Sequence, residues 1–218
     1  MIRAGVVRFW WRTVFALCER HRFDGADVRI FLPGTAERQI LVQKCRGAFE
    51  LLRTYAPRQL LRLRNFTDGV LVLGEDSFVL GEWMAPARLI RLNAAFMLKP
   101  ETRPVDIAAT VVHETTHAWL EHCGYRYTVE RRPRIEAICY RSEAAFARQL
   151  PDGEDLATVF DICAELALQD ENAWTDTALR ELTLNQLREI GAPTWITNAH
   201  CTPNSRMTAT RVECYLLC

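Results

Sequence analysis

Residues 105–123 read VDIAATVVHETTHAWLEHC, and this stretch decides the fold. It begins directly after Pro104, and Gly124 behind it supplies a natural C-cap for a helix. The residues beside the central His113-Glu114-Thr115-Thr116-His117 are uncharged, as expected for a helix that is buried in a protein interior. We therefore predict one buried helix over residues 105–123.

The central five residues carry side chains suited to metal chemistry. His113 and His117 are four residues apart, so both imidazoles project from one face of a helix and can bind the same zinc ion. Glu114 lies beside the first histidine and can accept a proton from a water at the metal. The alternative is a helix whose histidines make ordinary hydrogen bonds and hold no metal. Burial of these three side chains without partners would be costly, which favours the metal.

A second helix is predicted over residues 134–149. Pro133 suits the first turn of a helix, and Glu136 follows in that turn. Eighteen residues separate Glu136 from His117. The sequence therefore contains a His-Glu-x-x-His motif and, after a fixed interval, a glutamate at the start of the next helix.

This combination resembles the gluzincin zinc peptidases, the group that contains thermolysin and many zinc aminopeptidases. The local sequence at residues 113–120, 124–126 and 136–139 is similar to that of the peptidase domain of plant growth-regulating proteins that carry LIM and ubiquitin-interacting modules. Those modules are not found in this sequence, and the resemblance covers about residues 88–150. It implies that His113, His117 and Glu136 bind one Zn²⁺ per chain. It also implies that Glu114 is the catalytic base and that the substrate is a peptide or protein.

Other side chains near the motif are alternatives for the third ligand. Cys123 stands where metzincins place a third histidine, but Leu120 occupies the position at which that architecture needs glycine. His122 points to another face of the helix, and Glu143 is interpreted as solvated or as a partner of a ligand. Because a carboxylate completes a His₂Glu catalytic site with an open water position, Glu136 is the predicted third ligand.

Two further parts of the site follow from the resemblance. Such peptidases use a tyrosine or histidine to stabilise the oxyanion, and the predicted residue is Tyr140, with Tyr125 and His200 as alternatives. They also align an extended substrate along a sheet edge, which we expect at the strand Arg88–Asn93. The substrate-binding residues predicted on that strand are Leu89, Arg91 and Asn93.

The remaining periodicities predict an α+β fold of the zincin type, with a small mixed sheet, N-terminal helices and a helical C-terminal lobe. Helices are predicted at 2–21, 36–55, a short stretch after Pro57, 155–168 and 176–190. Strands are predicted at Val28–Leu32, 69–74, Ser77–Leu80 and Arg88–Asn93. We interpret residues 1–218 as a single domain with a basic helical region at 1–64, a catalytic core at 69–150 and an acidic helical region at 151–218.

Composition excludes several classes of protein. The chain has 218 residues, 49% of them hydrophobic, and its 27 basic residues balance 27 acidic ones, which argues against a nucleic-acid binder and against disorder. Its apolar runs are too short for a membrane span.

The eight cysteines form no C-x-x-C pair and the N-terminus lacks a secretory pattern, so we expect free thiols and a cytoplasmic protein. His200, Cys201, Cys214 and Cys218 lack the spacing of a structural zinc site. The sequence does not indicate an oligomeric state.

The competing hypothesis is a non-catalytic interaction module, or a zincin that has lost activity. Residues 1–64 contain 13 basic and 5 acidic side chains, while residues 150–218 contain 4 basic and 11 acidic ones. The basic region could bind a partner, or the two ends could attract each other. For the N-terminal helix we favour packing against the core over a membrane-surface anchor built on Trp10 and Trp11.

Overall fold

The computed structural model describes residues 4–31, 34–74, 80–128 and 130–168, and the side chains from residue 8 onward. The chain divides into two compact units, Met1–Tyr125 and Arg126–Cys218. The division falls inside the predicted catalytic core at 69–150. The predicted helix at 176–190, the greater part of the predicted strand Ser77–Leu80, and residues His200, Cys201, Cys214 and Cys218 lie outside the described residues.

The first unit contains a five-stranded mixed sheet with the order β1-β2-β3-β5-β4. Its central strands β2 (Ala26–Phe31), β3 (Gly69–Leu73) and β5 (Leu89–Asn93) are parallel. The outer strands β1 (Glu19–Phe23) and β4 (Gly81–Met84) pair antiparallel with β2 and β5. All five residues of β3 are buried, as expected for a central parallel strand covered on both faces.

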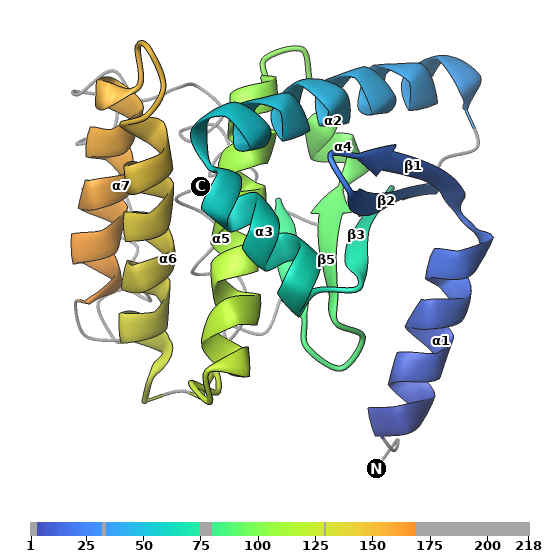
Figure 1. Ribbon diagram of the computed structural model, residues 1–218, viewed down its shortest axis with the longest axis horizontal. Helices are drawn as coiled ribbons and strands as arrows, with labels where there is room; N and C mark the ends of the chain where they lie inside the picture. Colours follow the sequence, from blue (N-terminus) through green and yellow to red (C-terminus); the bar gives the residue numbers. More distant parts are fainter. Residues whose placement is uncertain (1–3, 32–33, 75–79, 129, 169–218) are drawn as a thin grey trace, which may run out of the picture. The chain divides into compact units, whose positions relative to one another are not determined.

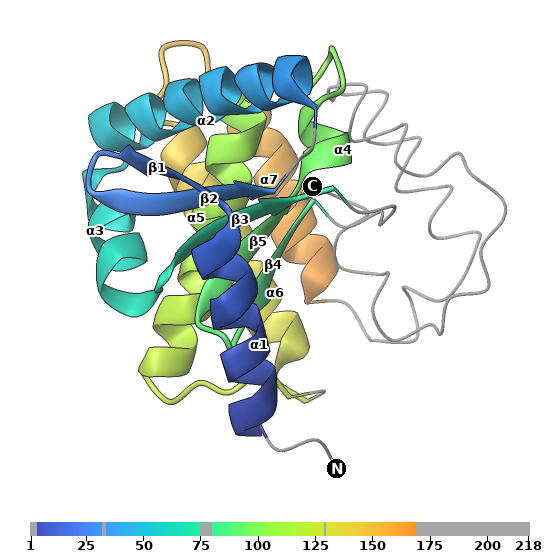
Figure 2. The same ribbon diagram turned by 90° about the vertical axis from the view of Figure 1, so that its right-hand side faces the viewer.

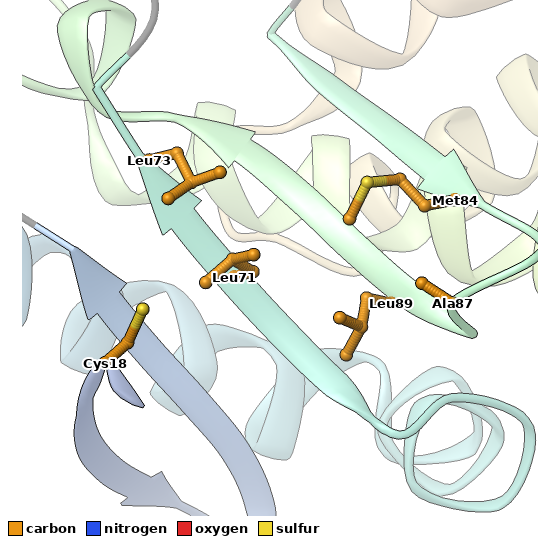
Figure 3. Close-up of a cluster of buried hydrophobic side chains, with 6 residues drawn as sticks. All are labelled: Cys18, Leu71, Leu73, Met84, Ala87 and Leu89. Carbon is orange, nitrogen blue, oxygen red and sulfur yellow. The ribbon is translucent and has the colours of Figure 1, made fainter. Parts of the chain in front are cut away.

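Helices cover both faces of this sheet. Helix α1 (Ala4–Leu17) lies on one face, and α2 (Thr35–Tyr55), α3 (Pro57–Phe66) and α5 (Pro104–His122) lie on the other (Figures 1 and 2). The short helix α4 (Ala94–Met97) continues directly from β5, and its first turn is capped by the Asn93 side chain. On the α1 side, the core cluster consists of Cys18, Leu71, Leu73, Met84, Ala87 and Leu89 (Figure 3).

The second unit contains two packed helices, α6 (Arg132–Ala147) and α7 (Glu154–Ala167). The side chains of Cys139 and Tyr140 on α6, and of Phe160 and Cys163 on α7, are at most 1% exposed. Within the described ranges of both units, every helix is too short or too polar to cross a membrane.

The α+β class and the mixed sheet are confirmed. The prediction of one helix over 2–21 is wrong at its end, because residues 19–23 form β1. β1 turns into β2 through Asp24 and Gly25, which have φ angles of 46° and 84°. Such a pair of positive φ angles suits a tight hairpin that follows the twist of two antiparallel strands. The charged residues of β1 therefore pair with β2 and do not extend helix α1.

The structure also contains a strand, β4, that the sequence did not predict. β4 begins at Gly81, directly after the predicted strand Ser77–Leu80. Its position corrects a second expectation: β5, which carries Leu89, Arg91 and Asn93, lies between β3 and β4 and is not an edge. The main-chain groups of β5 are paired on both sides, so they cannot align a substrate as a sheet edge would.

Candidate metal centre

Helix α5 begins in a well-defined way. Pro104 occupies the first turn, where its missing N–H costs no hydrogen bond. The buried Asp106 carboxylate accepts a hydrogen bond from the Arg103 backbone N–H at 2.7 Å and from the Arg103 guanidinium at 3.1 Å. An acidic group in the first turn also suits the positive end of the helix dipole. These contacts fix the start of the helix that carries the motif.

The same helix ends at Gly124 as the sequence predicts. Gly124 has a φ of 85°, which glycine adopts without strain. The Gly124 N–H donates to the Glu121 carbonyl and the Tyr125 N–H donates to the Leu120 carbonyl, both at 2.9 Å. This pair of bonds is the Schellman arrangement that closes a helix end. The predicted helix at 105–123 is therefore confirmed to within one residue at each end.

The motif lies in the buried middle of α5. The exposed fractions of His113, Glu114 and His117 are 3%, 1% and 7%. The two imidazole rings have centroids 5.0 Å apart, and their ligand atoms lie within 4.8 Å of one another. Two nitrogens bound to one zinc ion at about 2.0–2.1 Å lie roughly 3.4 Å apart, so small side-chain rotations bring this pair into ligand geometry.

Two of the three threonines in this part of α5 satisfy their hydroxyl groups inside the helix, while the buried Thr115 hydroxyl has no hydrogen-bond partner among the described residues. Thr110 and Thr116 donate their hydroxyl hydrogens to the carbonyls of Asp106 and Val112, at 2.9 and 2.8 Å. A buried hydroxyl that bonds back to the preceding turn avoids the cost of an unsatisfied polar group. Thr110 and Thr116 can therefore be buried without replacement by apolar residues.

Strand β4 runs against the motif face of α5. A Cβ atom placed on Gly81 would lie 2.5 Å from Thr110 Cγ2 and 3.3 Å from Glu114 Cγ, so the strand approaches as closely as only glycine allows. Two residues further on, the Trp83 indole N–H donates to the Glu121 carboxylate at 2.6 Å. Among the described strands β4 pairs only with β5, so its other edge is an edge of the sheet.

In the second unit, Glu136 lies in α6 with an exposed fraction of 3%. The Tyr127 hydroxyl donates a hydrogen bond to Glu136 Oε1 at 2.6 Å. A hydrogen bond of this kind fixes the orientation of a carboxylate and is typical of residues behind a metal ligand. Sequence reasoning missed Tyr127, because a residue in the loop before α6 carries no periodic signal.

The other predicted residues have distinct surroundings. The His122 ring packs in a tilted arrangement against Phe66 of α3, with 4.5 Å between ring centroids, which agrees with its predicted place on another face of α5. Cys123 and Tyr125 are exposed, and Tyr140 is 1% exposed. The interpretation of Glu143 as solvated is wrong, because its side chain is fully buried in α6.

The three residues predicted to bind substrate have structural contacts within the first unit. Leu89 is buried in the core, Arg91 forms an ion pair with Glu82, and Asn93 caps α4.

The chain matches no protein-family model, no curated protein and no solved structure. The functional inference therefore depends on the chemistry of these residues.

Proposed function

We propose that the chain is a zinc-dependent peptidase. The observation that carries the proposal is the buried pair His113 and His117, one turn apart on α5, with the equally buried Glu114 beside them. Two imidazoles from one helix can bind a catalytic zinc ion together with a carboxylate from another segment, and the glutamate beside the first histidine can act as general base. Small side-chain rotations would bring the two imidazole nitrogens to the spacing of two ligands on one zinc ion.

Glu136 is our choice for the third ligand, because of its spacing from the motif and its burial. Its bond from Tyr127 would hold the carboxylate in one orientation. Cys139, one turn further along α6, is the alternative, since a thiolate is also a zinc ligand. Zinc content separates the two: Glu136→Ala loses zinc and Cys139→Ala retains it if Glu136 is the ligand.

A bound zinc ion would supply Lewis acidity, which polarises a peptide carbonyl and lowers the pKa of a water. The chain supplies the rest of the chemistry. Glu114 accepts a proton from the attacking water and delivers it to the leaving amine, so the glutamate acts first as base and then as acid. Tyr140 remains the predicted oxyanion residue.

The strand that aligns the substrate is β4 in this proposal. Its outer edge can pair with an extended peptide through main-chain hydrogen bonds. Gly81 brings that strand against Glu114, and the bond between Trp83 and Glu121 holds it on α5. A peptide added to β4 would therefore pass close to the general base.

The direct test is Glu114→Gln in the full chain, with zinc content and hydrolysis of an unstructured protein such as casein measured together. We expect unchanged zinc and loss of hydrolysis by at least about a hundredfold, the usual contribution of a general base. Glu50→Gln, at an exposed position on α2, is the matched control and should retain most activity. Full activity of Glu114→Gln would refute the mechanism.

A further inference from the structure

Helix α1 has two apolar faces, and within the described part of the chain only one of them packs against the core. Trp11, Val14 and Phe15 are partly buried and pack against the core cluster shown in Figure 3. Phe9, Trp10 and Leu17 are 73%, 62% and 80% exposed. The structure thus separates the two adjacent tryptophans, because one belongs to the core face and the other faces outward.

The exposed apolar side chains form a stripe along one side of the helix, interrupted by the half-buried Thr13. At 100° per residue, Phe9, Thr13 and Leu17 follow one another along the helix, and Trp10 lies next to that row. Phe9, Trp10 and Leu17 are the three most exposed large apolar side chains among the described residues. Exposed apolar residues that gather on one surface, unlike scattered ones, mark an interaction site.

Positive charge borders this stripe. Arg8 and Arg12 lie along one side of α1, and the helix contains no acidic residue. Arg12 forms an ion pair with Asp68 at 3.0 Å, and the same carboxylate also meets Arg88 at 3.3 Å, so two cations share one anion. The 13 basic and 5 acidic residues within 1–64 extend the same sign of charge.

The positive charge beside the stripe distinguishes between two binding partners for this face of α1: a second copy of the chain and a lipid surface. In a symmetric dimer through this face, the stripe of one copy would meet the same stripe of the other, and the arginines of both copies would be brought together. An anionic lipid surface instead offers negative headgroups to the arginines and an apolar boundary to the aromatic side chains. The combination of aromatic, leucine and arginine side chains therefore favours a membrane surface.

We propose that the exposed face of α1 docks on an anionic lipid surface. With 14 residues, α1 is about 21 Å long and lies along the surface, with Phe9, Trp10 and Leu17 in the headgroup boundary. Arg8 and Arg12 contact lipid phosphates. The proposal is independent of the zinc site, since no residue of α1 belongs to that site.

The test is co-sedimentation of the full chain with phosphatidylcholine vesicles, with and without phosphatidylserine. We expect binding that requires phosphatidylserine, weakens with salt, and falls about tenfold or more when Trp10→Ser and Leu17→Ser are combined. Arg8→Glu should weaken binding without removing any apolar surface. Leu61→Ser, at a position 54% exposed on α3, is the matched control and should bind as the wild type does.

Three results would overturn the proposal. One is the absence of phosphatidylserine-dependent binding by the wild-type chain. A second is equal loss of binding in the Leu61→Ser control, which would show a non-specific effect of exposed apolar surface. The third is a dimer, measured by light scattering, that the Trp10→Ser and Leu17→Ser changes dissociate, since the occupant would then be a second copy.

Discussion

Gly81 gives the sharpest test of how β4 and α5 fit together. Gly81→Ala adds a methyl group that would lie 2.5 Å from Thr110 Cγ2, 3.3 Å from Glu114 Cγ and 3.4 Å from Leu92 Cδ2. The first distance is far below van der Waals contact, and the atom it meets is the methyl group of a short side chain on a buried helix. The strand or the helix must therefore shift.

Two opposing effects set the change in the free energy of unfolding that Gly81→Ala causes. Overpacking of a buried site costs about 1–3 kcal/mol. Replacement of glycine by alanine inside a strand recovers about 0.5–1 kcal/mol through the conformational entropy of the unfolded chain. We therefore expect Gly81→Ala to lower the free energy of unfolding by about 1 kcal/mol, the difference between the centres of these two ranges. If Glu114 is the general base that we propose, a shift of its carboxylate by 1 Å would also lower the rate of hydrolysis by about a hundredfold.

A second substitution tests the cause. Thr110→Ser removes the methyl group that the new Cβ meets and keeps the hydroxyl that bonds to the Asp106 carbonyl. In urea titrations of the two single variants and the double variant, we expect the double variant to be more stable than the sum of the single effects by about 1 kcal/mol. Additivity within about 0.5 kcal/mol would refute the contact between β4 and α5.

Two further outcomes follow from individual side chains. Tyr127→Phe should weaken zinc binding by about tenfold or more, measured by chelator competition, because Glu136 loses the hydrogen bond that orients its carboxylate. Tyr125→Phe is the control and should leave the zinc affinity unchanged. Equal zinc affinities of the wild type and both variants would exclude a role for Tyr127. Burial raises the pKa of the Cys45 thiol to about 12, so in the native protein at pH 8 this thiol stays neutral and iodoacetamide should modify it far more slowly than the exposed Cys123. Peptide mapping by mass spectrometry measures both sites, and rapid modification of Cys45 in the folded chain would contradict its placement in the core.

The sequence predicted the helices well because their signals are local. The helix over 105–123 has apolar residues, a proline before it and a glycine after it, and the structure agrees to within one residue at each end. The first strand β1 was missed, although Asp24-Gly25 is a recognised hairpin signal. The amphipathic spacing of α1 was extended to residue 21, although residues 19–23 pair with the neighbouring strand β2 across that turn.

In the candidate metal centre too, features set by neighbouring residues could be predicted from the sequence, and features that depend on distant residues could not. The spacing of His113 and His117 was enough to predict a shared face, because helical geometry fixes it. The edge strand was assigned to β5, and the structure gives that place to β4, because strand order is a property of the whole sheet. The close approach of Gly81 to Glu114 likewise joins residues more than thirty positions apart, which no sequence pattern reveals.

The most direct test of the proposed metal centre is the zinc content of the purified chain by elemental mass spectrometry. We expect about one zinc per chain, retained in Glu114→Gln and lost when His113 and His117 are both replaced by alanine. His122→Ala is the matched control on the same helix and should keep its zinc, because that ring packs against Phe66 of α3. A wild-type chain without zinc, or a double histidine variant that keeps it, would contradict the proposed centre.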